Sequence, residues 1–318
     1  ITLSTGAYGD SGLVALYLVT VGVIVLIVAT ILRWIGHLSR LGRVKDTTDK
    51  VEAAAQTALS RRLENPYLGA RPLRDAAREI PAGAQPVFTA NVGYLQHVDI
   101  GHLSELVGEG AGRVFVTVLP GEFIHPARPL ARFEGIEAED AAERIAKAFS
   151  IGNERSFDQD PRFGLLVLAE IASRALSPAV NDPGTAIDVI GRAVRLFLAW
   201  GQPGDKTQET AKDGDGEAVR YPRVWVRPLS LDDMFDDIFV PLARDGAGMV
   251  EIQVRLQKAF AALHDSGGRE MKDSALRFSK LALARAEAGL VLEPEKQRVR
   301  ALADAIGKPA HLLSVQPG

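Results

Sequence analysis

The sequence predicts an α+β membrane protein with one visible transmembrane helix, a small β-rich barrel-like module and a mostly helical cytoplasmic domain. Three observations support this fold class: an uncharged apolar run at 13–32, alternating valines at 114–118, and helical spacing of apolar residues through most of 137–318. The chain divides accordingly into 1–36 (extracytoplasmic lead and membrane helix), 37–66 (cytoplasmic stalk helix), 86–134 (barrel-like module) and 137–318 (helical cytoplasmic domain with a disordered loop at 201–218).

The membrane helix is the clearest single feature. The run LVALYLVTVGVIVLIVATIL at 13–32 carries no charge, and its twenty residues reach roughly 30 Å as a helix, the thickness of the bilayer core. Cations follow the run, whereas a signal peptide carries them before it. By the positive-inside rule the chain beyond it is cytoplasmic, and the flank that sets this orientation is Arg33, His37, Arg40, Arg43 and Lys45. Anchoring to lipid headgroups explains these side chains without a ligand.

The composition disfavours several classes of protein. A net charge of −3 over 318 residues gives no global basic field, so nucleic acid is not an expected partner. The absence of cysteine excludes disulfides, thiolate zinc sites, iron–sulfur clusters and cysteine nucleophiles. The motifs G-x-S-x-G, G-x-x-x-x-G-K-[ST] and G-x-G-x-x-G are also absent, which disfavours ordinary serine hydrolases, nucleotidases and dehydrogenases. We therefore expect no cofactor.

Helices are expected on both sides of the β-rich module. In the stalk, Val51, Ala55, Ala58 and Leu59 recur at helical spacing before Asn65-Pro66 ends the run. Its alanine-rich face permits close approach to a neighbouring helix, either in the same domain or in a second copy. After a strand at 219–226, further helices are expected at 231–242, 249–264, 274–289 and 294–306, and one precedes the central hairpin at 137–149.

The β-rich module is predicted from alternation. Val114, Val116 and Val118 alternate with other residues as in a strand with one buried face, and Pro120-Gly121 makes a turn. The run VTVLPGEFIHPARPLARF resembles the hairpin of biotinyl- and lipoyl-type barrels. Those domains carry a lysine at the hairpin tip, but no lysine occurs between Lys50 and Lys147. We therefore expect a small structural barrel without a carrier role.

The main candidate site lies in the polar segments around two central helices that begin at Asp160-Pro161 and Asp182-Pro183. Charges crowd the first helix start, where an anion or phosphate group could meet free backbone N–H groups. Capping and a tight interhelical turn explain much of the same pattern without a ligand. The first helix is about 24 Å long, so the two groups should not share one metal ion. The candidates are Arg155, Asp158, Asp160 and Arg162 at the first start, and Ser177, Asn181, Asp182 and Thr185 in the turn.

A metal site is a weaker interpretation. His97, Asp99 and His102 form the compact set of possible ligands, with His125 on a neighbouring strand of the expected barrel. Their spacing matches no standard zinc pattern such as H-E-x-x-H. Surface histidines are the favoured explanation, and we assign no metal.

Several short strings together carry a family resemblance. They are Gly93-Tyr94-Leu95-Gln96, Pro120-Gly121-Glu122-Phe123, Arg155 with Asp160-Pro161-Arg162-Phe163-Gly164, Ala175-Leu176-Ser177-Pro178, Asn181-Asp182-Pro183 and Thr185-Ala186. The chain resembles the C-terminal portion of the bacterial membrane family known as domain of unknown function 2254. That resemblance implies the bacterial plasma membrane and further membrane helices upstream, and brings no established activity. Where the family often has a histidine pair after its last span, this chain has Gly36-His37.

Two functional hypotheses follow. The first is an oligomeric channel or transport-related assembly in which the cytoplasmic domain, a homo-oligomer beneath the bilayer, controls a path through the membrane. The alternative is a membrane-tethered enzyme, or a protein that binds a small anion or phosphate-containing ligand through the segments 155–160 and 177–185. A non-enzymatic role is favoured over an enzymatic one, because the sequence contains no recognised catalytic signature.

Overall fold

The computed structural model describes residues 10–38, 44–108, 110–201 and 219–308. The chain forms two compact units, residues 1–49 and 50–318, which we describe separately. The first unit contains helix α1 (Asp10–Leu38). Residues Val14–Trp34 of α1 have a mean hydropathy of 2.8 and none of them is buried, so length and composition make α1 a candidate membrane span.

The predicted membrane flank is described only in part. Arg33 near the end of α1 and Lys45 in the first turn of α2 (Val44–Glu64) are both exposed. Arg40 and Arg43 lie outside the described residues, as does the predicted loop at 201–218 except for its first residue. For His37 the structure gives the helical backbone alone.

In the described residues of the second unit, eight short strands form two sheets. The larger sheet has the order β1-β8-β4-β6-β2, in which β8 runs parallel to both of its neighbours and the other pairs are antiparallel. The smaller sheet has the antiparallel order β5-β3-β7. The strands of the larger sheet are β1 (Ala70–Pro72), β2 (Gln85–Val87), β4 (Arg113–Val116), β6 (Ala131–Glu134) and β8 (Tyr221–Val226), and those of the smaller sheet are β3 (Gly93–Val98), β5 (Phe123–Ile124) and β7 (Phe149–Gly152).

The predicted barrel is wrong. Within the described residues both sheets are open, and strands from outside 86–134, namely β1, β7 and β8, complete them. Val114 and Val116 are buried as alternation predicts, but Phe115 between them is buried too and stacks on Trp225 of β8. The local pattern identifies a strand, whereas its partner β8 lies over a hundred residues further along the chain.

Helices α4 (Ile100–Val107) and α5 (Ala141–Ala146) pack on the larger sheet, whereas the short helix α3 (Ala76–Glu79) has no buried residue. Asp99 begins α4, because its carboxylate accepts a hydrogen bond from the backbone N–H of His102. The helix expected at 137–149 is shorter than predicted, since Phe149 instead pairs with Val98 in the smaller sheet. Apolar side chains from the strands, α4 and α5 form one core.

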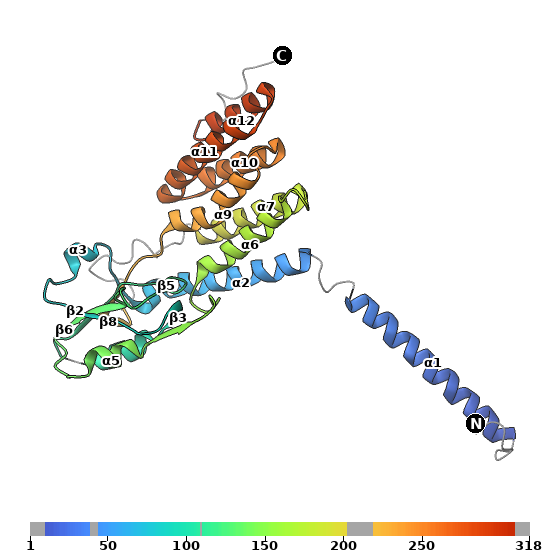
Figure 1. Cartoon of the computed structure of the whole chain (residues 1–318), viewed down its shortest axis with the longest axis horizontal. Coiled ribbons are helices and arrows are strands. Elements are labelled where there is room, and N and C mark those ends of the chain that lie inside the picture. Colours follow the sequence, from blue (N-terminus) through green and yellow to red (C-terminus); the bar gives the residue numbers. More distant parts are fainter. Residues whose placement is uncertain (1–9, 39–43, 109, 202–218, 309–318) are drawn as a thin grey trace. The chain divides into compact units, whose positions relative to one another are not determined.

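The remaining helices form a second core and stack in layers (Figure 1). Helix α9 packs between α6 and α11, and α10 contacts α7, α11 and α12. Phe197, Phe235, Phe239 and Phe260 contact one another at the centre. The four C-terminal helices were all predicted, and the helices of this layer are α6 (Pro161–Ala175), α7 (Pro183–Trp200), α9 (Leu231–Asp245), α10 (Val250–Ser266), α11 (Arg269–Gly289) and α12 (Glu293–Ala305).

Helix α2 packs on this layer through its alanine face. Ala55 is fully buried against Gly164 of α6, where an added methyl group would overlap the Ala55 side chain. Beside this contact, Glu52 of α2 pairs with Arg192 and Arg195 of α7. The hydrogen bond from Arg195 is the main cause of a lowered pKa of Glu52. The alanine face was expected to pack on a helix of the same domain or of a second copy. The structure shows it packed on α6 of its own domain.

Candidate functional site

A cavity of about 370 Å³ lies where the end of α2 meets β3, the start of α4 and β8. Arg61 and Arg62 of α2 line it from one side. His97 of β3 and Asp158, from the segment before α6, line it from another, and Tyr221 opens β8. Side chains far apart in the sequence therefore line one cavity that is open to solvent.

A β-bulge in β3 aims His97 away from the core. Leu95 pairs with Ile151 and His97 with Ser150, so Gln96 is the extra residue on this strand. As a result Leu95 and Val98 are both buried, while Gln96 and His97 are both partly exposed. Without the bulge, strict alternation would turn His97 toward the core face.

The outward face of β3 holds the segment 153–160 in place. Gln96 Nε2 donates to the backbone oxygen of Glu154 over 2.7 Å. His97 Nδ1 lies 2.8 Å from Asp158 Oδ2. The side chain of Gln159 accepts from the backbone N–H of Val98 and donates to its carbonyl oxygen. Three consecutive residues of β3 thus position one wall of the cavity.

Arg62 is the distinctive group of this cavity. Its side chain lines the cavity although the residue is only 6% exposed. Its Nη2 donates to the backbone oxygen of Gln159 over 2.9 Å, and within the described residues no ion pair joins it to a carboxylate. Burial lowers the pKa of Arg62 to about 10, and the charge of Asp160 offsets this only in part. A guanidinium offers five N–H donors, so an anion in the cavity would find donors and a positive charge that is only partly compensated.

Arg192 shows what compensation looks like in the same domain. It is only 4% exposed, but its guanidinium contacts the carboxylates of Glu52 and Asp188. Removing a charged group from water costs on the order of several kcal/mol in free energy unless carboxylates or other partners replace the lost water. Arg62 therefore carries a desolvation cost that a ligand could relieve.

Other charges around the cavity favour an anion. Arg61 and Arg220 add to Arg62, so three arginines face two aspartates, Asp99 and Asp158. Both aspartates have internal partners, since Asp99 caps α4 and Asp158 contacts His97 and, at 3.8 Å, Arg61. The balance of charge in the cavity is therefore positive.

The predicted residues Arg155 and Asp160 form a closed pair beside this cavity. Arg155 Nε and Nη2 donate to the two oxygens of Asp160 over 2.7 and 3.0 Å. The same carboxylate caps α6 by accepting from the backbone N–H groups of Arg162 and Phe163. Burial raises the pKa of Asp160, against the lowering effect of Arg155 and the two N–H groups. Asp160 thus occupies the helix start at which an anion was expected.

The turn at Gly121 packs directly against the Arg155–Asp160 ion pair. Gly121 has a φ of +93°, and a side chain there would collide with the Asp160 carboxylate and come within 2.8 Å of Arg155 Nη2. Two strings that carry the family resemblance, the Pro120-Gly121 turn and the helix start at Asp160, therefore meet in one contact.

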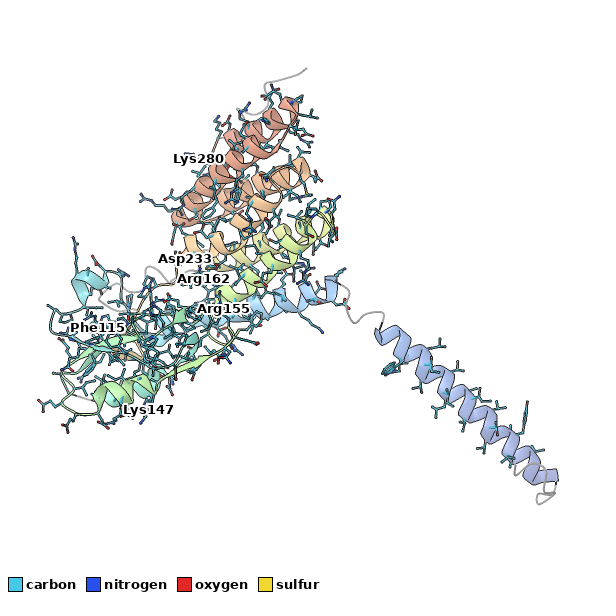
Figure 2. The ribbon with its side chains drawn as sticks, in the orientation of Figure 1. Phe115, Lys147, Arg155, Arg162, Asp233 and Lys280 are labelled. Atoms are coloured by element: carbon cyan, nitrogen blue, oxygen red, sulfur yellow. The ribbon has the colours of Figure 1, made fainter. Side chains whose placement is uncertain are left out.

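Arg162 connects α6 to α9 and does not line the cavity. Its Nε lies 2.7 Å from Asp237 Oδ2, and its Nη1 lies 2.7 Å from Asp233 Oδ2. Figure 2 shows Arg162 and Asp233 side by side, with Arg155 near the same end of α6. Burial lowers the pKa of Arg162, but the two aspartates outweigh it and the net shift is upward.

The turn candidates lie at the far end of α6, which is about 22 Å long at 1.5 Å per residue. Ser177 Oγ donates to the carbonyl oxygen of Arg174, and Asn181 takes a left-handed conformation with a φ of +47°. Asp182 caps α7 by accepting from the N–H and hydroxyl of Thr185, which lower its pKa. These bonds stabilise an exposed turn that is separate from the cavity.

The three metal candidates do not come together. His97 and Asp99 line the same cavity, but His102 does not. His97 is bound to Asp158, and Asp99 caps α4. In the described part of the chain, no group of three or more His, Cys, Asp or Glu side chains could hold a metal ion.

Sequence reasoning missed Arg61, Arg62 and Tyr221. A signal for Arg62 was present, because it continues the helical stripe of Val51, Ala55 and Leu59 onto the buried face of α2. An arginine in an apolar stripe indicates either a buried partner or a ligand. Tyr221 had no comparable signal, since its place in the cavity depends on the pairing of β8.

The described residues form a candidate membrane helix and, after it in the sequence, an α+β domain that holds a positively charged cavity. The chain belongs to the DUF2254 family, described as predicted membrane proteins, whose family model matches residues 1–262. This confirms the resemblance seen in the sequence.

The relatives bring no activity. Uncharacterised proteins of Mycobacterium bovis and Mycobacterium tuberculosis are each 36% identical to this chain over 127 residues. The matched region is 37% of this chain and 24% of either relative, so the chain spans about a quarter of the length of these proteins. No solved structure matches the chain.

Proposed function

We propose that this membrane protein binds a small phosphate-containing anion in the cavity at the end of α2. The observation that carries the proposal is Arg62, a buried arginine that faces a cavity and has no carboxylate partner among the described residues. Guanidinium groups pair with phosphate oxygens through parallel N–H donors, and such bonds are about twice as strong as neutral ones. Arg61 and Tyr221, which also line the cavity, carry further donor groups.

The orientation and assembly belong to the same proposal. We place the ligand-binding domain on the cytoplasmic side of a bacterial plasma membrane, because the cations flank one end of the apolar run. We place several copies around a transport path, so that ligand binding would regulate it. In the sequence, α2 begins six residues after α1 ends, so the helix carrying Arg62 is the one next to the membrane helix. That adjacency favours ligand sensing over a tethered enzyme.

Calorimetry tests the proposal on the full chain in nanodiscs of zwitterionic lipid. We expect glycerol 3-phosphate to bind, succinate to bind at least tenfold more weakly, and Arg62→Met to remove phosphate binding. The matched control is Arg298→Met, since Arg298 is exposed on α12 and lines neither described cavity. Unchanged binding by Arg62→Met, with Arg298→Met behaving the same way, would contradict the proposal.

A further inference from the structure

A second cavity lies next to the arginine-lined one. It has a volume of about 830 Å³ and includes Asp158, which lines both cavities. Its apolar lining comes from Tyr94 of β3, Phe157 before α6, and Phe163 and Leu166 in the first turns of α6. Phe157 and Phe163 contact each other with ring centres 4.6 Å apart.

Strand β3 makes the two cavities neighbours along one face. Tyr94 and Gln96 line the second cavity, and His97 lines the first. Tyr94 and Gln96 share a face by alternation, and the bulge at Gln96 brings His97 onto that face, away from the buried Leu95 and Val98. From Tyr94 to His97 the strand advances about 10 Å at roughly 3.3 Å per residue. A ligand of moderate length could therefore reach from one cavity into the other by crossing at Asp158.

The charged side chains of the second cavity disfavour another anion. Its cation Arg155 is engaged by both oxygens of Asp160. Glu154 and Glu170 also line it and would repel a negative group. The apolar surface continues outward from Tyr94, whose ring packs edge-on against Phe123, a residue that is 50% exposed. An uncharged aliphatic or aromatic group suits this lining.

We infer that the ligand is an amphiphile, with a phosphate monoester in the first cavity and an aliphatic chain in the second. This inference rests on the proposed phosphate binding and adds the chain to it. A lipid bilayer supplies molecules of this class, and the candidate membrane helix keeps the protein beside that supply. Free phosphate esters share the head group but lack the chain, so the two sources differ in one measurable respect.

Three short probes separate head from chain: glycerol 3-phosphate, 1-hexanoylglycerol 3-phosphate and uncharged 1-hexanoylglycerol. Their binding is measured on the full chain in zwitterionic nanodiscs, with empty nanodiscs subtracted. We expect the hexanoyl phosphate to bind at least tenfold more tightly than either of the other two. The chain length keeps the probes below micelle formation at the concentrations needed.

Leu166→Gln tests the second cavity directly. It should reduce the tenfold gain to less than threefold and leave the Kd for glycerol 3-phosphate within a factor of two. Tyr94→Ser serves as an independent variant on β3, should Leu166→Gln not fold. The matched control is Leu281→Gln, because Leu281 is a partly exposed leucine of α11 that lines neither cavity.

The possible failures are distinguishable. If glycerol 3-phosphate binds through Arg62 but the hexanoyl chain raises the affinity less than twofold, the inference of an amphiphilic ligand is overturned and the proposed phosphate binding stands. If neither phosphate binds, both proposals fail. If 1-hexanoylglycerol binds as tightly as its phosphate, the head group has no role and the inference is overturned.

Discussion

Arg62 and Asp160 are both buried charges near the start of α6, but they are satisfied in different ways. Asp160 has a bidentate arginine and two backbone N–H groups, whereas the hydrogen bond of Arg62 goes to a backbone carbonyl group. A buried group without full compensation lowers stability, and such groups are found where a protein binds something. We therefore expect substitution of Arg62 to change the stability of the ligand-free protein little, and substitution of Asp160 to lower it strongly.

Arg62→Met is expected to have little effect on the folded protein without ligand. Relief of the desolvation cost and loss of the Gln159 hydrogen bond oppose each other, so the free energy of unfolding should change by less than about 2 kcal/mol. Glycerol 3-phosphate should raise the Tm of the wild type and leave that of the variant unchanged. Arg192→Met is the contrast, since it leaves Glu52 and Asp188 without this partner and should cost about 1.5–3 kcal/mol. A large loss from Arg62→Met alone would mean that Arg62 is structural.

The two caps should differ in strength. Asp160→Ala removes a fully buried carboxylate and leaves Arg155 unpaired, which should cost about 3–5 kcal/mol. Asp182 is exposed, so Asp182→Ala should cost about 1 kcal/mol. Urea unfolding of both variants at pH 7 measures this difference. Equal losses would show that each aspartate acts as a simple cap, as the sequence alone predicts.

The Asp182 contribution should also depend on pH. Hydrogen bonds from Thr185 hold its folded pKa below the ordinary value, so the charged form is favoured by folding. Its stabilising effect is present above about pH 4 and is lost as the pH falls through the folded pKa. The stability gap between wild type and Asp182→Ala should therefore narrow in acid, as measured by unfolding between about pH 2.5 and 7. A gap that stays constant would exclude the charge as its cause.

At the scale of elements, the contact of α2 with α6 depends on Gly164. A methyl group there would overlap Ala55 and lie 3.0 Å from its Cα, so Gly164→Ala should cost about 1–3 kcal/mol through overpacking. Gly191→Ala on α7 is the matched control, since its nearest neighbour is Arg195 Nη1 at 4.0 Å. That change should stabilise the protein by up to about 1 kcal/mol. Urea unfolding gives both values, and a stabilising Gly164→Ala would show that the two helices are not in close contact.

Helices were predicted well because their signals are local. The caps at Asp99, Asp160 and Asp182 and the four C-terminal helices follow from spacing and capping residues within one turn. The sheets were not, because Val114 pairs with Val224 and no local pattern shows such a partner. The cavity itself was not predicted: His97 and Asp99 were candidates for a metal site, and Asp158 for an anion site at the start of α6. These residues line one cavity with Arg62 only because the fold brings β3, α2 and β8 together, and no local sequence pattern shows that arrangement.

At the scale of the whole molecule, cysteine labelling tests the orientation of the protein in the membrane. The native chain has no cysteine, so Arg298→Cys gives a single labelling site on the exposed face of α12. An impermeant maleimide should leave this cysteine unlabelled in intact cells and label it after permeabilisation, because the cations predict a cytoplasmic domain. Labelling in intact cells would reverse the orientation.

Assembly is tested at the same scale. We expect native mass measurement of this chain in nanodiscs to show a homo-oligomer, because a path lined by the described candidate membrane helix needs several copies of that helix. The alanine face of α2 no longer supports this expectation, since Ala55 and Ala58 are buried in their own domain. A monomer would remove the transport hypothesis and leave ligand binding unaffected.

The structure of the full chain with saturating glycerol 3-phosphate tests the central claim most directly. The phosphate should occupy the cavity between the end of α2, β3 and the start of α4, within hydrogen-bond distance of the Arg62 guanidinium. Phosphate bound elsewhere on the chain, or a cavity that stays empty at saturation, would contradict the assignment of Arg62 as its anchor.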